Sequence, residues 1–392
     1  MISFDEALAL VLAEASPLGP EEIKLETGAG RRLAAPLVAA IDAPRTDVSV
    51  MDGYAVREAE LGGVLRVTGE SFPGCGFAGE IGAGECVRIF TGAPVPDGCD
   101  RVVIQEQAAR DGDAVRFNTS AGDPPFIRRR ASDFTAGDML AVAGRRVDSR
   151  LLLAAAGADR AHLQVWRRPR VAILATGDEL VAPGTARFAA EAVPDSLSIG
   201  IAAAVAEQGG EIMLRDRLPD DPARILYAVD LALAKADVIV VTGGASVGEK
   251  DFAQAALDAA GMTRIFSKVR MKPGKPVWFG RAGDSLVLGL PGNPVSAMVT
   301  ARLFLAPLLA GLGGSDPAEA LRWRKLPLAA PLPACGDRET FTRARMAEAG
   351  AESLERQESG AHRSFADADL LIRQRPLEPA RAAGEEVEIL DL

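Results

Sequence analysis

Short runs of branched apolar residues alternate with longer amphipathic stretches through the second half of the chain. The runs lie at residues 171–175, 211–214, 237–241 and 286–290, and the stretches with apolar residues at helical spacing lie at about 197–208, 222–235, 252–260 and 295–310. Continuous apolar runs of this length are typical of strands buried on both faces of a sheet. The alternation therefore predicts a multidomain α/β protein whose residues 169–314 form a doubly wound parallel-sheet domain.

The pattern changes to short β-like runs separated by Gly and Pro between residues 45 and 133. The runs lie at residues 64–67, 87–90, 101–105 and 115–117. Asp111-Gly112-Asp113 lies between the last two runs and predicts a hairpin turn. Residues 45–133 are therefore expected to form an all-β module inserted into the chain.

Helical spacing flanks this module. Ser3 and Glu6 have the spacing of a capping box before an amphipathic helix, and further helices are predicted at 31–40 and 149–158. Residues 1–44 and 134–168 are thus expected to form a helical scaffold domain. After residue 314, short runs at 341–346, 370–373 and 387–390 predict a small C-terminal β-barrel or sandwich over residues 315–392.

The composition narrows the chemistry. The chain has 392 residues, of which 48% are hydrophobic, and a net charge of −10, which argues against general nucleic-acid binding. No apolar run reaches the ~18 residues of a membrane span and residues 1–20 lack the features of a signal peptide, so a cytoplasmic location is expected. The four cysteines show no CxxC spacing and predict neither a zinc site nor a disulfide framework. With only two histidines in the sequence, a Ser-His-Asp triad is not expected. Carboxylates, lysines, arginines and backbone groups must supply the chemistry.

Small residues and acids follow two of the predicted strands. The strand at 237–241 runs into Thr-Gly-Gly-Ala-Ser at 242–246, and the strand at 171–175 runs into Thr-Gly-Asp-Glu at 176–179. One such loop is as often a simple tight turn as a binding loop. Because ligands of open α/β sheets bind at the carboxyl edge of the strands, two strands that end alike predict two loops facing one crevice.

Two further loops could bind anions. The segment SKVRMKPGKP at 267–276 carries four cations around a Pro-Gly turn and could supply the basic patch that an acidic protein needs for an anionic substrate, although a solvated surface loop is the alternative. The segment LPGNP at 290–294 opens a predicted helix, whose N-terminus favours phosphate, with an ordinary N-cap as the alternative.

Together these segments resemble the molybdopterin molybdenumtransferases, the family of MoeA and the gephyrin E domain. The motifs are SVMDGYAV at 49–56, IFTGAPVPDGCDRVVIQE at 89–106, ATGDEL at 175–180, TGGASVGEKDF at 242–252, MKPGKPVWFG at 271–280 and GLPGNPVSA at 289–297. Each motif alone is unspecific, but the ordered set covers the chain and is highly specific.

The resemblance implies four domains, with an α/β domain similar to the MoaB and MogA proteins and a β module that acts as a lid. It implies a homodimer whose active cleft joins the lid of one subunit to the α/β domain of the other. The implied reaction converts adenylylated molybdopterin and molybdate into molybdenum cofactor and AMP, with Mg²⁺. Other proteins of cofactor synthesis would be partners, and neither nucleic acid nor a membrane would be.

The resemblance also assigns the site residues. The catalytic set is Asp52, Thr91 and Asp133 on the lid and Glu179, Asp220 and Asp251 on the α/β domain, and of these Glu179 and Asp251 would hold the metal. The substrate-binding set is Gly243, Gly244, Ser246, Lys272, Lys275, Pro291, Gly292, Asn293 and Pro294. These residue types suit the chemistry, because Mg²⁺ takes oxygen ligands and because lysines and helix N-termini suit pyrophosphate.

The chain departs from the family pattern in three places. Leu197 stands where an amide is usual, Ala131-Ser132 replaces the usual Gly-Glu, and the linker at 183–194 is atypical. A diverged paralogue that handles another oxyanion, such as tungstate, is therefore an alternative. Two others are the molybdopterin adenylyltransferase, which would not need residues 1–165 or the C-terminal domain, and a non-catalytic scaffold, which would not need so many acids and lysines in its loops.

Overall fold

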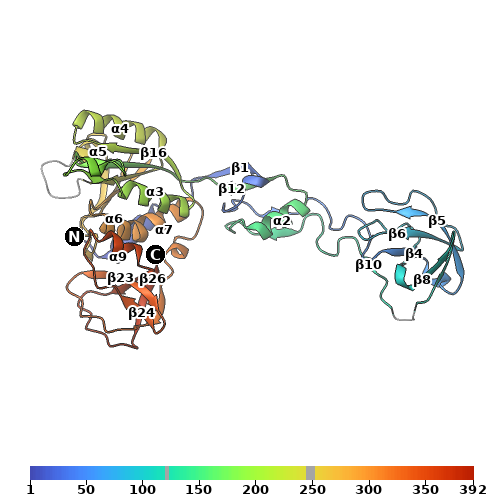
Figure 1. The fold of residues 1–392 in the computed structure, drawn as a ribbon. Coiled ribbons are helices and arrows are strands. Elements are labelled where there is room, and N and C mark those ends of the chain that lie inside the picture. The colour runs from blue at the N-terminus through green and yellow to red at the C-terminus, as the bar shows by residue number, and fades with distance from the viewer. Residues whose placement is uncertain (120–122, 244–251) are drawn as a thin grey trace. The chain divides into compact units, whose positions relative to one another are not determined.

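The computed structural model describes residues 1–119, 123–243 and 252–392, and the chain divides into two compact units (Figure 1). Unit 1 contains Met1–Glu21, Gly30–Ala34 and Val165–Leu392. Unit 2 contains Glu22–Ala29 and Ala35–Gln164.

A six-stranded sheet forms the centre of unit 1, in the order β16–β13–β17–β21–β20–β18. The first four strands are parallel: β16 (Glu211–Leu218), β13 (Arg170–Thr176), β17 (Val238–Thr242) and β21 (Ser285–Leu290). They confirm the predicted parallel sheet. Two further strands, β20 (Trp278–Ala282) and β18 (Thr263–Ser267), were not predicted; β20 is antiparallel to β21, and β18 is antiparallel to β20 at the edge of the sheet.

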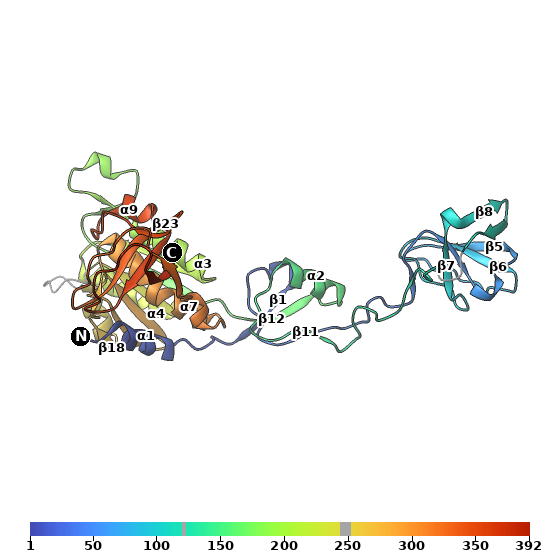
Figure 2. The same ribbon diagram turned by 90° about the horizontal axis from the view of Figure 1, so that it is seen from below.

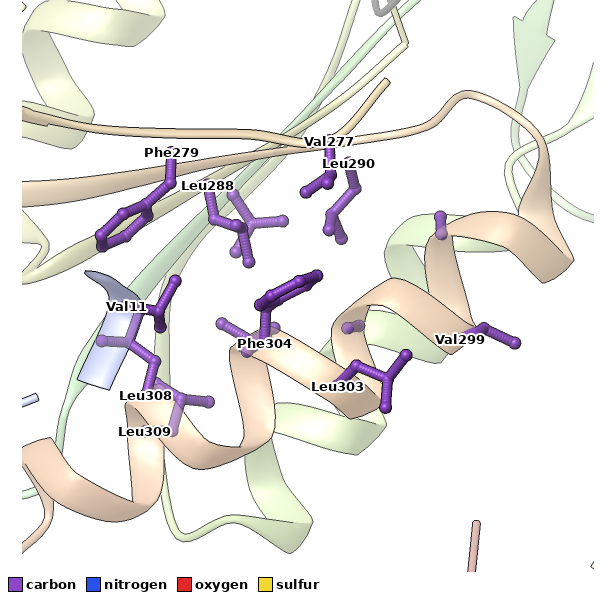
Figure 3. Packing of buried hydrophobic residues seen from close by; sticks show 14 of the residues in the cluster. Val11, Val277, Phe279, Leu288, Leu290, Val299, Leu303, Phe304, Leu308 and Leu309 are labelled. Atoms are coloured by element: carbon purple, nitrogen blue, oxygen red, sulfur yellow. The ribbon is translucent and has the colours of Figure 1, made fainter. Parts of the chain in front are cut away.

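Helices cover both faces of this sheet (Figures 1 and 2). Alternate residues of one strand belong to the hydrophobic clusters on opposite faces. One layer contains α4 (Pro222–Lys235) and α5 (Phe252–Ala259) and packs against Ile239 and Val241. The other layer contains α1 (Phe4–Ala13), α3 (Leu197–Glu207), α6 (Pro294–Thr300), a π-helical turn (Ala301–Leu305) and α7 (Ala306–Leu312). It packs against Val238 and Val240, and Figure 3 shows part of this core.

The continuous helical stretch Pro294–Leu312 corrects one expectation. It has 19 residues, and the mean hydropathy of its most apolar 18-residue window is 1.7, so it is the one helix in the described ranges that is long and apolar enough to cross a bilayer. However, 89% of its most apolar window is buried inside the protein. Phe304 points toward Leu288 and Leu290 of the sheet (Figure 3), and Leu303 and Leu308 are fully buried in the same core, so this stretch is a core helix of the α/β domain.

The C-terminal part of unit 1 forms a second six-stranded sheet. It runs β19 (Met271–Lys272), β23 (Glu339–Ala347), β25 (Leu370–Gln374), β26 (Glu386–Asp391) and β22 (Arg324–Pro327), and β24 (Gly350–Ser353) pairs with β23. These strands confirm the three predicted C-terminal runs. The short helices α8 (Pro317–Ala320) and α9 (His362–Ala366) accompany the sheet. Phe341, Leu371 and Leu390 belong to the α/β core, so the two sheets share one hydrophobic interior.

Unit 2 contains a six-stranded sheet in the order β7–β4–β6–β5–β9–β8. The strands are β7 (Arg101–Ile104), β4 (Gly53–Val56), β6 (Glu85–Ile89), β5 (Val64–Ser71), β9 (Ala114–Phe117) and β8 (Ala108–Asp111). The hairpin predicted at Asp111-Gly112-Asp113 is confirmed, since β8 and β9 pair across it. The strand β4 was not among the predicted runs; it is a fully buried strand in which a Cβ on Gly53 would lie 1.9 Å from the Val103 carbonyl oxygen.

The expected helical scaffold is mostly not helical. It contains α2 (Ser149–Gly157), as predicted, together with the short strand pairs β1 (Pro20–Lys24) with β12 (His162–Trp166) and β2 (Leu37–Val38) with β11 (Met139–Ala141). The helix expected at 31–40 is wrong, because Pro36 lacks the N–H that a helix interior needs and the chain is extended there. The remaining short elements are the pairs β3 (Val48–Ser49) with β10 (Ile127–Arg128) and β14 (Leu180–Val181) with β15 (Val193–Pro194), and the 3₁₀ turns η1 (Leu25–Thr27), η2 (Glu58–Glu60), η3 (Gln105–Gln107) and η4 (Ala186–Phe188).

Phe4 of α1 joins the two halves of unit 1. The ring centroid of Phe4 lies 5.4 Å from that of Phe304 and 4.9 Å from that of Phe341. The Arg373 guanidinium lies 5.0 Å from the centroid of the Phe4 ring. Since Phe4 is fully buried, we expect Phe4→Ala to lower the free energy of unfolding of unit 1 by about 3–5 kcal/mol. Urea unfolding followed by tryptophan fluorescence measures this change.

The three tryptophans Trp166, Trp278 and Trp323 all lie in unit 1 and report on it alone. The matched control is Leu10→Ala, on the exposed side of the same helix, for which we expect a loss under about 1 kcal/mol. Equal losses in the two variants would contradict the role of Phe4.

Candidate active site

Three parallel strands of unit 1 end at the same level. Ala175 of β13 lies opposite Thr242 of β17, and Thr242 lies opposite Leu290 of β21. Because the strands are parallel, the loops that follow them leave from one edge of the sheet. This edge is where the sequence predicted a crevice.

The loops after these strands touch each other. Gly243 has a φ of 91°, and a Cβ there would lie 2.3 Å from the carbonyl oxygen of Thr176. A Cβ on Gly292 would lie 3.7 Å from the Cα of Gly243. Gly243 and Gly292, both predicted as binding residues, therefore lie side by side, and Gly243 can carry no side chain without displacing the loop after β13.

Acidic residues of two loops are tied together at this edge. Asp220, after β16, donates its N–H to Oδ1 of Asp178, in the loop after β13, at 2.9 Å. Asp178 thereby holds the loop that carries the predicted residue Asp220. This role of Asp178 was not predicted, because nothing in the sequence pattern distinguishes Asp178 from its neighbour Glu179.

Glu179 has a solvent-exposed carboxylate to which no residue within 1–119, 123–243 or 252–392 donates a hydrogen bond. Its two oxygens lie over Gly177, 2.7 and 2.8 Å from where a Cβ of that glycine would be. A carboxylate held over a residue without a side chain and left with free lone pairs suits an oxygen ligand of a cation.

The predicted residues Gly244, Ser246 and Asp251 lie outside the described residues. The pairing of Glu179 with Asp251 around a metal therefore stays a prediction. In the part of the chain that the structure describes, no three His, Cys, Asp or Glu side chains gather as a ready metal site.

The basic segment is fixed in place and is not a free surface loop. Lys272 belongs to β19 of the C-terminal sheet, and a Cβ on Gly274 would lie 2.5 Å from Oγ1 of Thr300 in α6. Lys272 and Lys275, both exposed, line a cavity of about 1020 Å³ between the α/β domain and the C-terminal sheet, which Ser296 of α6 also lines.

A buried arginine lines the same cavity. Arg343 of β23 is 1% exposed, and its Nε has no hydrogen-bond partner among the described residues. Its Nη2 donates to the carbonyl oxygens of Arg356 and Glu358, at 3.4 and 3.3 Å. Burial lowers the pKa of Arg343, so an anion nearby would stabilise its charged form. The sequence did not predict Arg343, because β23 also contains Glu339 and Arg345 and nothing in its pattern separates the buried Arg343 from the exposed Arg345.

The cavity carries both signs of charge. Its cations are Lys272, Lys275, Arg338 and Arg343, and its acids are Asp337, Glu355 and Glu358. Lys272 and Arg343 belong to the C-terminal sheet, Lys275 lies in the loop that leads to β20 of the α/β sheet, and Ser296 of α6 lines the same cavity, so an anion bound there would lie between the α/β domain and the C-terminal sheet.

The segment Pro291–Pro294 opens α6, as predicted. Pro291 is buried, and Asn293 is the N-cap but makes no side-chain capping hydrogen bond. The amide of Val295 donates to the carbonyl oxygen of Ser359 at 3.0 Å. One of the amides expected to be available for a phosphate is thus already engaged by the C-terminal part of the chain.

In unit 2 the structure brings Asp52 and Thr91 together. The amide and the hydroxyl of Thr91 both donate to Oδ1 of Asp52, each at 2.8 Å. These two hydrogen bonds, with the charge of Arg88, lower the pKa of Asp52. Asp52 is therefore firmly ionised and holds the turn that carries Thr91.

Asp133 lies in the other loop of unit 2 that was predicted to face the substrate. Its N–H donates to the carbonyl oxygen of Ala43 at 3.0 Å, its side chain is exposed, and no donor in the described ranges reaches its carboxylate. Ala131, which departs from the family pattern, has a φ of 57°, in the left-handed region that favours the glycine usual there. Among the described residues, no hydrogen bond or ion pair joins Asp133 to the Asp52–Thr91 pair.

Leu197, which also departs from the family pattern, is a core residue. Its side chain is buried among Ile201 and Val171 at the start of α3. The neighbouring Asp195 accepts hydrogen bonds from the amide and hydroxyl of Ser198, at 3.1 and 2.5 Å, and closes the first turn of the helix. An amide at position 197 would be buried here, so the leucine favours packing over ligand contact.

Three family models match consecutive parts of the chain: the MoeA N-terminal region (domain I and II) at residues 2–158, the probable molybdopterin binding domain at 172–311 and the MoeA C-terminal region (domain IV) at 325–392. The molybdopterin molybdenumtransferase of Haemophilus influenzae is 34% identical over 331 residues, which are 83% of this chain and 80% of the relative. That of Synechococcus elongatus is 31% identical over 377 residues, 92% of each chain. The crystal structure of a molybdopterin biosynthesis MoeA protein from Pyrococcus horikoshii matches with a TM-score of 0.85 and 26% identity, over 100% of this chain and 99% of that one.

The Asp52–Thr91 pair gives a prediction about pKa. Thr91→Val removes the hydroxyl donor and keeps the amide, which is the larger cause of the lowered pKa. We expect the pKa of Asp52 to rise part of the way toward its ordinary value of 3.8. Carboxyl ¹³C NMR across a pH titration measures it, with Thr68→Val of the same sheet as the matched control.

The lowered pKa of Asp52 also determines how the stability of unit 2 depends on pH. Because folding lowers the pKa of Asp52, the pair stabilises unit 2 at pH values above 3.8 and loses this contribution as the pH falls through the lowered value. Thr91→Val should therefore lose less stability on acidification than the wild type. An unchanged Asp52 pKa in Thr91→Val would show that the hydroxyl contributes nothing.

Proposed function

The chain belongs to the molybdopterin molybdenumtransferase family, and from this premise we propose that it inserts molybdate into adenylylated molybdopterin and releases AMP. Its role as a transferase of molybdenum cofactor biosynthesis follows from the family membership. The adenylylated form of the substrate, the metal, the residues that act and the subunit arrangement are our proposals.

The observation that carries the substrate assignment is the cavity lined by Lys272, Lys275 and Arg343 beside the carboxyl edge of the sheet. A tetrahedral dianion offers acceptors in several directions. It would supply the partner that the buried Arg343 Nε lacks and would pair with both lysines. Molybdate and tungstate share this shape and charge, so the cavity chemistry favours a tetrahedral oxyanion of this class, of which molybdate is the family's substrate.

The acids at the same edge suit a different part of the reaction. We propose that Glu179 holds Mg²⁺ together with Asp251, and that Asp220, held by Asp178, faces the same bound pyrophosphate. The free carboxylate of Glu179 above Gly177 supports this assignment. When bound, the ion would offset the repulsion between these acids and the phosphate oxygens. Gly243, Gly244 and Ser246 would bring backbone amides to the same phosphates, and Pro291–Pro294 would form the adjacent wall.

The lid residues Asp52, Thr91 and Asp133 belong to unit 2, whereas the acids and cations belong to unit 1. We propose that the protein is a cytoplasmic homodimer in which the unit 2 residues of one subunit complete the unit 1 site of the other. We also propose the fourfold domain division expected from the sequence, with other proteins of cofactor synthesis delivering substrate and removing product.

The competing functions have less support. An adenylyltransferase would need only the α/β domain, yet relatives named as molybdenumtransferases align over up to 92% of the chain. A non-catalytic scaffold would not need an exposed carboxylate and a buried cation at the edge of the sheet.

A direct assay tests the oxyanion site. Wild-type protein with adenylylated molybdopterin, Mg²⁺ and molybdate should release AMP, and Lys272→Gln with Lys275→Gln should raise the KM for molybdate at least fivefold, since an exposed charge contact is worth up to about 1 kcal/mol. Tungstate measured in parallel tests the paralogue alternative. The matched control is Lys235→Gln on α4, outside the cavity. No AMP release by the wild type would refute the function, and an unchanged KM in the double variant would refute the cavity as the oxyanion site.

Mixed dimers test the shared site. Asp52→Asn and Glu179→Gln should each lose most activity alone. If the site combines two subunits, a mixed dimer keeps one intact site, and random mixing of the inactive variants should recover about one quarter of the wild-type activity. If each site lies within one subunit, every site in the mixture is defective and activity stays at the level of the single variants.

A further inference from the structure

A column of stacked side chains in unit 2 ends at an exposed aromatic ring. The Arg88 guanidinium lies 5.0 Å from the ring centroid of Tyr54 and 4.9 Å from that of Phe90. Phe90 stacks on Phe72, with centroids 4.5 Å apart and planes 11° from parallel. The Arg88 guanidinium and the Phe72 ring therefore both pack on Phe90. Tyr54 is buried and Phe72 is 41% exposed, so the column runs from the core of the β module to its surface.

The backbone fixes the outer ring beside the Asp52–Thr91 pair. The amides and carbonyls of Phe72 and Cys75 exchange two hydrogen bonds, each at 3.0 Å, which close a tight turn. The amide of Phe90 donates to the carbonyl oxygen of Ser71, the residue before Phe72, at 3.2 Å. Since Thr91 directly follows Phe90, the exposed ring and the Thr91 hydroxyl are held on adjoining backbone.

A single exposed phenylalanine needs no explanation. Phe72 differs because its ring is held parallel to a second ring that itself lies over a cation, and because the column rises next to a residue pair assigned to the substrate cleft. Rings fixed in this way bind flat heterocycles with little loss of side-chain entropy, because no rotamer has to be frozen on binding. The Arg88 guanidinium, which lies over the Phe90 ring, adds a cation–π interaction to the column.

We propose that the exposed face of Phe72 is a stacking platform for a flat nitrogen heterocycle of the substrate. The chemistry fits either the adenine or the pterin ring of adenylylated molybdopterin. The inference rests on the proposed function, because that function supplies a substrate with both rings, and it makes Phe72 a residue that determines affinity and specificity on the lid.

The first test measures binding without turnover. The sequence has no tryptophan between residues 22 and 164, so Phe72→Trp introduces a single reporter into unit 2 while keeping a stacking surface. Titration with AMP or with free pterin should quench the added fluorescence in a saturable way, and the ligand that quenches identifies the ring. Tyr227→Trp, at an exposed aromatic on α4, should show no quenching beyond that of the wild type.

The second test separates binding from chemistry. Phe72→Ala should raise the KM for adenylylated molybdopterin about tenfold, with kcat within about twofold, because a stacked base is typically worth a factor of this size. Phe72→Trp should stay near the wild type, and Phe72→Leu, which keeps apolar area without a π face, should behave like Phe72→Ala. A merely structural role would instead lower kcat and stability together.

The failures are distinguishable. A wild type that releases AMP, with an unchanged KM in Phe72→Ala and no quenching of the Phe72→Trp variant by either ligand, overturns the platform and leaves the proposed function standing. A wild type that releases no AMP overturns the function, and the fluorescence titration then decides the platform alone: quenching by one ring supports it and quenching by neither overturns it.

Discussion

The parallel register of β13, β17 and β21 is the constraint on which the unit 1 site depends. With Ala175, Thr242 and Leu290 at one level, the chain must turn three times at the same edge. The turns fit only because Gly243 has no side chain to collide with the carbonyl of Thr176. Helices cover both faces of the sheet, so loop residues at this edge are the ones left free to contact a ligand.

The C-terminal sheet adds the positive charge that this edge needs. Lys272 is a residue of β19, the edge strand of that sheet, while Lys275 lies in the loop that returns to the α/β sheet. Arg373 ties the same sheet to α1: it bonds Glu339 and Asp5, each at 2.5 Å, and lies over the Phe4 ring. Burial raises the pKa of Glu339 although Arg373 opposes the rise. Such a pair is costly unless its geometry is fixed, which suits a joint that positions the cavity.

The sequence predicted the parts of the fold that depend on local pattern. The four parallel strands, the helices between them and the hairpin at Asp111–Asp113 follow from periodicity and turn chemistry. The strand β4 was missed because it has only four residues and begins with Gly53, so it lacks the branched apolar run that marks the other buried strands. The motifs do not predict contacts between residues that are far apart in the sequence. The Asp178–Asp220 hydrogen bond joins residues 42 positions apart, and Arg343 lines one cavity with Lys272 because β23 pairs with β19.

The predicted site acids Asp52 and Glu179 differ in what they can do. Oδ1 of Asp52 already accepts two hydrogen bonds from Thr91, so this carboxylate is committed to holding the Thr91 turn. The carboxylate of Glu179 accepts no hydrogen bond within the described ranges. It lies over Gly177, where its oxygens are free to accept a cation. An ionised acid already saturated on one oxygen suits positioning, and an unsatisfied one suits ligation. The same residue type therefore serves the lid by fixing a hydroxyl and the α/β edge by offering a charge, and the hydrogen-bond partners decide between these roles.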